Sequence, residues 1–265
     1  MKHHLVIDTS MTELESLPIR STKYVTCLRM VRKVLVRELK TDFSIELFDR
    51  LGLVAGFIDQ HLDELSHNEQ NVLFSDYHDL FNLLWEQSYY ILFKHEICSF
   101  VDRHNFVFNC EALYLKDLFL FIQYCKATDI KKDIYNFGQT IIHTALRKHS
   151  ASTTESLVRE LQNEGEAVIQ LLRVLLDTKV SSITEFEKTL SLLTELEHIL
   201  NLADDALDVK SDMRQGLINP ELGPLHQLKM HYRVIKQIIK TIVLYPLKTM
   251  YYAPRLTWYF ILNTI

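Results

Sequence analysis

Glycine, proline and cysteine are scarce in this sequence, and long apolar runs are missing. The 265 residues include only 6 Gly and 5 Pro. So few turn-forming residues leave little room for a sheet of many strands joined by tight hairpins, and they favour long helices with short polar connections. We therefore predict an all-α fold, a single helical bundle domain over residues 1–265 with a polar leader at 1–20.

The cysteine pattern, the N-terminus and the charge argue against a disulfide-stabilised, secreted or nucleic-acid-binding protein. The 4 Cys residues lack CxxC spacing and lie in apolar helical contexts, which is typical of buried free thiols in a reducing cytosol. The N-terminus lacks the apolar core of a secretory signal, so we expect a cytoplasmic protein. The net charge is −5 and the basic residues are scattered, which argues against nucleic acid as a partner.

The C-terminal TIVLYPLKTMYYAPRLTWYFILNTI is the longest apolar stretch. Pro246, Lys248, Pro254 and Arg255 interrupt it, so it does not predict a membrane span. Two roles stay open for this aromatic and aliphatic tail. It suits a lid over an apolar pocket, and it also suits an interfacial anchor that gives the protein a peripheral membrane contact.

Apolar periodicity and capping residues predict the helices. The ranges are about 21–39, 42–65, 112–148, 155–177, 182–214 and 226–265, the last broken at its prolines. Gly138 lies inside the third of these, where it predicts a kink or a close backbone approach. Residues 68–110 are rich in aromatic side chains, which indicates either core packing or a pocket that binds a cation.

An acidic stripe marks the predicted helix 182–214. Its members recur at helical spacing, so they share one face: Glu197, Asn201, Asp204, Asp205, Asp208 and Asp212. Leucines cover the opposite face, which predicts one side in the core and an acidic side facing a cleft. A solvated charged face is the ordinary explanation of such a run. Oxygen ligands without Cys or His are also what Mg²⁺ prefers, so a metal site is the sharper hypothesis.

A second acidic pair ends the predicted helix 42–65. Asp59 and Asp63 are four residues apart, with Glu64 beside them. Three small residues precede them on the same face: Gly52, Ala55 and Gly56. Small residues above two acids indicate either a closely packed neighbouring helix or the space of a substrate pocket, and the sequence leaves both open. Gly138 and Asn201 are further candidates for the pocket wall.

The two pairs together suggest a chemistry. Carboxylates from two helices that face each other can converge on Mg²⁺ ions that grip a diphosphate. Such ions neutralise the charge that builds up as a C–O bond breaks, so diphosphate becomes a leaving group and an allylic carbocation forms. Asp59, Asp63, Asp208 and Asp212 are thus the candidate catalytic residues. The cations expected to bind the diphosphate are Arg214, two residues past Asp212, and Arg32.

Both motifs resemble those of the squalene and phytoene synthase-like family. DVKSDMRQGLINP at 208–220 resembles the second DxxxD motif, and LVAGFIDQHLDE at 53–64 is similar to the first. The resemblance implies a class I isoprenoid synthase fold with a central active-site cavity, three Mg²⁺ ions and a farnesyl or geranylgeranyl diphosphate substrate. The implied metal ligands are Asp59, Asp63, Glu64, Asp204, Asp205, Asp208 and Asp212.

The chain departs from the family in lacking a Gly-rich nucleotide-binding loop for a reductive step. This weighs against head-to-head coupling to squalene. A terpene cyclase that releases a cyclic product, or a prenyltransferase to another acceptor, would share the metal chemistry. A non-catalytic helical interaction protein is the alternative from a different class.

Overall fold

A computed structural model of the chain describes residues 19–106, 114–215 and 225–252. Within these ranges the side chains of 19–23, 59–60, 63–64, 114, 178 and 208–215 are not described. The described residues form helices and no strand, which confirms the all-α prediction. The helices are α2 (Ile19–Leu39), α3 (Ile45–Glu64), α4 (His67–Glu86), α5 (Tyr90–His104), α6 (Tyr114–Ala127), α7 (Lys131–Ser150), α8 (Thr154–Leu176), α9 (Ile183–Gln215) and α10 (His226–Leu244), with a 3-10 turn at Asp177–Lys179. Residues 246–252 are also helical.

Two helix starts follow directly from capping residues. Ser66 accepts a hydrogen bond from the backbone N–H of Glu69, and the Glu69 side chain accepts one from the backbone of Ser66, which forms a complete capping box. Thr153 and Ser156 form the equivalent box at the start of α8. Each box satisfies backbone N–H groups that the first turn of a helix leaves without partners.

The single helix predicted over 112–148 is wrong, because the chain breaks between α6 and α7 at residues 128–130. Asp129 has a φ of 55°, in the left-handed region. Thr128 and Asp129 both compete with helical hydrogen bonding, and Asp tolerates the left-handed conformation better than most residues. The apolar pattern continues across this break, so periodicity alone does not reveal it.

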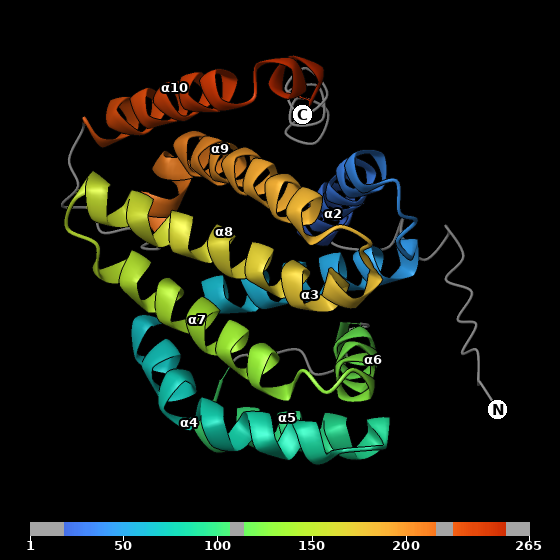
Figure 1. Cartoon of the computed structure of the whole chain (residues 1–265). Helices are drawn as coiled ribbons and strands as arrows, with labels where there is room; N and C mark the ends of the chain where they lie inside the picture. The colour runs from blue at the N-terminus through green and yellow to red at the C-terminus, as the bar shows by residue number, and fades with distance from the viewer. Residues whose placement is uncertain (1–18, 107–113, 216–224, 253–265) are drawn as a thin grey trace.

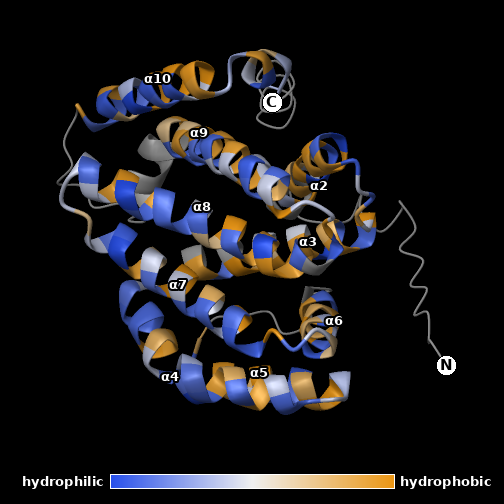
Figure 2. Cartoon of the chain, viewed as in Figure 1, coloured by the Kyte–Doolittle hydropathy of each residue, from blue (hydrophilic) through white to orange (hydrophobic). Residues whose placement is uncertain are grey.

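The helices stack in a fixed order (Figure 1). From α4 the packing passes to α7, α8, α9 and finally α10, which lies at the top edge of the view. The α2–α3 pair lies behind this stack, with α2 against α9 and α3 against α6. Figure 2 shows hydrophobic residues on α3 and α6, and also on α2, α5 and α10. None of the described helices combines the length and the apolar character needed to cross a bilayer.

The main core lies between α2, α3, α8 and α9. Its fully buried side chains include Leu35, Phe43, Phe48, Leu172 and Phe186. Burying a side chain of this size contributes about 1.5 to 3 kcal/mol. These same four helices surround the candidate site, so the core fixes its walls.

Candidate functional site

A cavity of about 500 Å³ lies among α2, α3, α8 and α9. Aliphatic side chains form most of its wall. They include Val31 of α2, Leu51 of α3, Ile169 and Leu172 of α8, and Leu193 and Leu200 of α9. Its size and its apolar wall are those of a site for one small organic molecule.

One part of the cavity wall is acidic. Asn201, Asp204 and Asp205 of α9 line this part, and Ala55 of α3 also lines the cavity. These four belong to the set of residues predicted from the sequence. Asp204 and Asp205 follow Asn201 by three and four residues, so α9 turns this part of its acidic stripe toward the cavity.

Glu197, also from the acidic stripe, is set into the same wall. Its Oε2 atom is buried without a hydrogen-bond partner in the described structure. Burial raises the pKa of Glu197 well above its ordinary value, the nearby Glu164 raises it further, and a hydrogen bond from Asn201 opposes the shift. The raised pKa favours the neutral acid in the folded protein.

Gly165 of α8 makes room for this carboxyl group. A Cβ at position 165 would lie 1.6 Å from Oε2 of Glu197. Glu197 was predicted as a member of the acidic stripe, whereas neither its burial nor the role of Gly165 was predicted. The available signal was a glycine in a helix interior, where it costs about 1 kcal/mol against Ala.

Lys148, at the end of α7, also lines the cavity, although no pattern in the sequence predicts it there. Its Nζ donates to Oε2 of Glu164 at 3.0 Å. Arg32, by contrast, does not line this cavity. Its guanidinium forms an ion pair with Asp42 at 2.7 Å and donates to the carbonyl oxygen of Phe43, so it stabilises the α2–α3 connection.

Tyr251 and Tyr252 bring the C-terminal region to another part of the cavity wall. The Cζ atom of Arg37 lies 3.4 Å from the centroid of the Tyr251 ring. The Tyr252 hydroxyl donates to Glu38 at 2.8 Å, and Lys248 pairs with the same carboxylate at 2.5 Å. These contacts fix residues 246–252 against α2.

The three glycines predicted to line the pocket, Gly52, Gly56 and Gly138, are not in the wall of this cavity. A Cβ on Gly52 would lie 2.6 Å from the Cα atom of Val25, so this glycine allows the backbones of α2 and α3 to approach closely. Gly56 is buried in α3 and is not part of the cavity wall. At Gly138 the approach comes from a side chain, since a Cβ there would lie 2.0 Å from the Tyr77 hydroxyl oxygen.

Six predicted residues have side chains outside the described part of the structure. They are Asp59, Asp63 and Glu64 in the last turns of α3, and Asp208, Asp212 and Arg214 in the last turns of α9. Their helices do reach the cavity. Asp59 follows Ala55 by four residues and Asp208 follows Asp204 by four, which is about one helical turn in each case. Figure 1 shows α3 and α9 running in the same direction across the bundle.

Among the side chains that the structure describes, no three His, Cys, Asp or Glu residues converge as a metal site. The donor types at the acidic wall are carboxylate oxygens from Asp204 and Asp205 and the amide oxygen of Asn201. Hard oxygen donors of this kind suit Mg²⁺ and not a soft metal.

No protein-family model, curated protein or solved structure matches this chain. The resemblance to the squalene and phytoene synthase-like family therefore stays a prediction that rests on the two motifs.

Proposed function

We propose that this protein is a Mg²⁺-dependent class I isoprenoid synthase. It would ionise an allylic prenyl diphosphate of the farnesyl or geranylgeranyl type and then couple or cyclise the cation. One observation carries the proposal: an apolar cavity has an acidic wall built from α9, and each of the helices α3 and α9 continues from a cavity residue to an Asp pair one turn further on.

The apolar wall is suited to a prenyl chain. A carbocation is short-lived where water or a base can reach it, so the chain must be enclosed by hydrocarbon. Val31, Leu51 and Leu172 supply such a surface. Glu197 is set into the cavity wall, and burial raises its pKa, which disfavours the charged form there.

The acidic wall is suited to the diphosphate end. Asp204 and Asp205 would hold Mg²⁺ together with Asp59, Asp63, Glu64, Asp208 and Asp212. Bound Mg²⁺ supplies positive charge that stabilises diphosphate as a leaving group. The chain's own part is to orient the substrate so that the C–O electron pair departs with the diphosphate at the acidic wall while the allylic carbon faces hydrocarbon. Arg214 and Lys148 are the candidate cations beside it.

Coupling and cyclisation differ in which double bond attacks the carbocation. In cyclisation a double bond of the same chain attacks it, and in coupling a double bond of a second molecule does so; loss of a proton completes either reaction. The volume of about 500 Å³ is in the range for one bound ligand, which favours cyclisation or transfer to a small acceptor over the joining of two long chains.

The experiment is incubation of the full chain with C10, C15 and C20 prenyl diphosphates and Mg²⁺. Released diphosphate is measured, and the extracted hydrocarbon is identified by mass spectrometry. We expect Mg²⁺-dependent release, lost in Asp59→Ala and in Asp208→Ala and retained in the control Asp79→Ala, an exposed acid on α4. Absence of release from every substrate would contradict the proposal and favour a non-catalytic interaction protein.

A further inference from the structure

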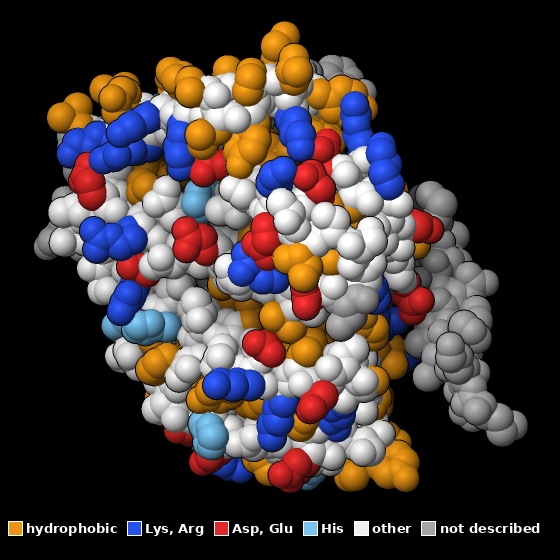
Figure 3. Space-filling view, in the orientation of Figure 1, with side chains coloured by type: hydrophobic (Ala, Val, Ile, Leu, Met, Phe, Trp, Pro, Cys, Tyr) orange, Lys and Arg blue, Asp and Glu red, His pale blue; other side chains and the backbone are white. Residues whose placement is uncertain are grey.

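Helix α10 exposes an apolar stripe along its outer side. The exposed residues recur at spacings of three and four, so they share one face. They are Leu228, Tyr232, Ile235, Ile239, Ile242 and Val243. The stripe continues past the helix into residues 246–252, where Leu247 is 82% exposed and Met250 is 73% exposed. Figure 3 shows this row of hydrophobic side chains along the edge of the molecule, over α10.

The inner side of α10 is largely polar. His226, Gln237 and Thr241 are buried there, with Met230 among them. Gln237 Nε2 donates to Glu195 at 2.7 Å, and the His226 ring shares a hydrogen bond of 2.8 Å with Thr154. An ordinary surface helix turns its apolar side to the core and its polar side to water. In α10 this arrangement is reversed.

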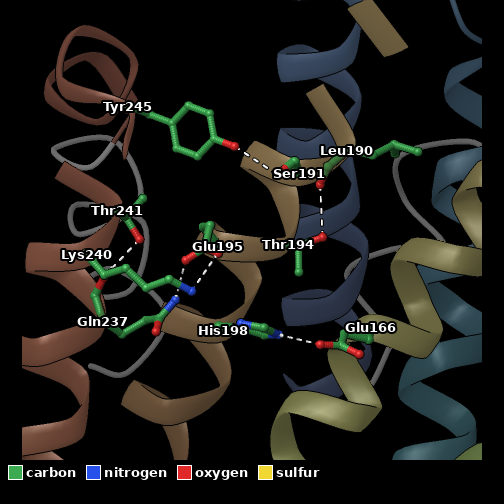
Figure 4. Close-up of polar contacts among 10 residues, drawn as sticks. All are labelled: Glu166, Leu190, Ser191, Thr194, Glu195, His198, Gln237, Lys240, Thr241 and Tyr245. Atoms are coloured by element: carbon green, nitrogen blue, oxygen red, sulfur yellow. Dashed lines mark hydrogen bonds and ion pairs between the residues drawn. The ribbon is translucent and has the colours of Figure 1, made fainter. Parts of the chain in front are cut away.

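Hydrogen bonds and ion pairs fix the helix in this orientation (Figure 4). Glu195 of α9 accepts from both Gln237 and Lys240, the latter at 2.8 Å. The Tyr245 hydroxyl lies 2.8 Å from that of Ser191, one turn before Glu195 on α9. Rotating α10 to bury its stripe would break these contacts and leave Glu195 without them. The exposed apolar face is therefore a consequence of how the helix is anchored.

Cations line one side of the stripe, and three of them form ion pairs with neighbouring helices: Arg233 with Glu155, Lys240 with Glu195 and Lys248 with Glu38. The sequence from 225 to 252 contains no Asp or Glu, and its cations are Lys229, Arg233, Lys236, Lys240 and Lys248. At helical spacing the first four lie along one flank of the stripe, and Figure 3 shows Lys and Arg side chains next to the hydrophobic row. Lys229 and Lys236 are exposed.

We propose that α10, with residues 246–252, docks this protein on a membrane surface that contains anionic lipids. An apolar stripe flanked by cations is the pattern of a helix that lies in the interface plane, with its apolar side among the acyl chains and its cations at the headgroups. Tyr232 and the long lysine side chains suit the boundary between the two.

A second copy of this chain is the less favourable occupant. In stripe-to-stripe packing the exposed Lys229 and Lys236 would lie beside the contact in both copies, and like charges across a contact oppose it. An anionic lipid surface has the complementary sign. The docking does not depend on the proposed isoprenoid chemistry, so an experiment that contradicts one proposal leaves the other standing.

The test is sedimentation of the full chain with phosphatidylcholine vesicles, prepared with and without phosphatidylglycerol. We expect binding to the vesicles that contain phosphatidylglycerol, weakened by added salt because the cations contribute. In Ile235→Glu with Ile239→Glu, the fraction bound should fall about tenfold or more, since two inserted side chains become charged. Both residues are exposed, so the fold is expected to tolerate the change, and circular dichroism checks this.

The matched control is Ile91→Glu with Ile183→Glu, which makes the same chemical change at two exposed positions on α5 and α9. It should bind vesicles as the parent does. Three outcomes would overturn the proposal: no binding by the parent, equal loss in the control, or full binding by the α10 variant, which would assign any membrane contact to other residues. A dimer that the α10 variant alone dissociates, without vesicle binding, would assign the stripe to self-association instead.

Discussion

Gly52→Ala is expected to destabilise the protein, although the same change in an ordinary helix stabilises it. A Cβ at this position would lie 2.6 Å from Cα and 2.8 Å from the backbone nitrogen of Val25. Backbone atoms cannot rotate away as a side chain does. The α2 and α3 helices must therefore separate, which disturbs the packing of buried neighbours such as Leu28 and Leu51.

The magnitude follows from two opposing effects. Replacing Gly by Ala in a helix interior gains about 1 kcal/mol from backbone propensity. Overpacking a well-packed contact typically costs about 1 to 3 kcal/mol, and the separation of two backbones belongs at the upper end. We expect a net loss of about 1 to 2 kcal/mol in the free energy of unfolding, measured by urea denaturation. For a chain of this size the melting temperature should fall by roughly 2 to 8 °C.

The control is Gly165→Ala, where the nearest atoms belong to the end of the flexible Glu197 side chain beside a cavity. That carboxyl group can turn away, so the loss there should be smaller. If Gly52→Ala were more stable than the parent by the full propensity gain, α2 and α3 would not be in backbone contact at this point. Gly52 would then not be required for the close packing of α2 and α3.

Three further predictions concern the buried Glu197, the capping box at Ser66 and Ala55 in the cavity wall. Because the folded-state pKa of Glu197 is raised, its contribution is greatest below the ordinary Glu value and declines as pH rises through the folded value, by up to about 1.4 kcal/mol per pH unit. In urea titrations, Glu197→Gln should therefore gain stability over the parent as pH rises above the ordinary Glu pKa, and parallel curves of stability against pH would contradict this. Ser66→Ala should lower stability by about 1 kcal/mol through loss of the capping box, with no change in slope against urea. If the proposed chemistry holds, Ala55→Phe should lower kcat/KM for a C20 diphosphate more than for a C10 one, whereas an equal loss would indicate general damage.

Much of the helical framework follows from the sequence. The starts of α8 and α9, predicted at 155 and 182, lie at Thr154 and Ile183, directly after the polar residues Thr153 and Ser182. Few glycines and prolines excluded a sheet. The break at residues 128–130 was not predictable from the apolar pattern, since the residues on both sides keep the same helical period and the left-handed φ of Asp129 leaves no periodic signal.

The site was predictable only where a pattern repeats along one helix. The acidic stripe led to Asn201, Asp204 and Asp205, all of which line the cavity. Lys148 and Gly165 come from other helices, and their nearness to the stripe depends on how α7 and α8 pack on α9. Pairings across helices carry no periodic signal, so a single sequence does not disclose them.

The orientation of α10 also could not be predicted from the periodicity of its own sequence. Its sequence is amphipathic, which normally predicts that the apolar side is buried. The structure turns that side outward because Gln237 and Lys240 bind Glu195. Specific polar contacts between two helices thus override the tendency that periodicity alone would predict.

We propose that the acidic pairs at the ends of α3 and α9 serve one Mg²⁺–diphosphate site. Calorimetric titration of the full chain with inorganic diphosphate tests it most directly, with and without Mg²⁺, in the parent, Asp59→Asn, Asp208→Asn and the control Asp79→Asn. We expect tight binding only when Mg²⁺ is present, a loss of about tenfold or more in each of the two site variants, and parent-like binding in the control. Binding that needs no Mg²⁺, or that survives in either Asp59→Asn or Asp208→Asn, would contradict a shared site.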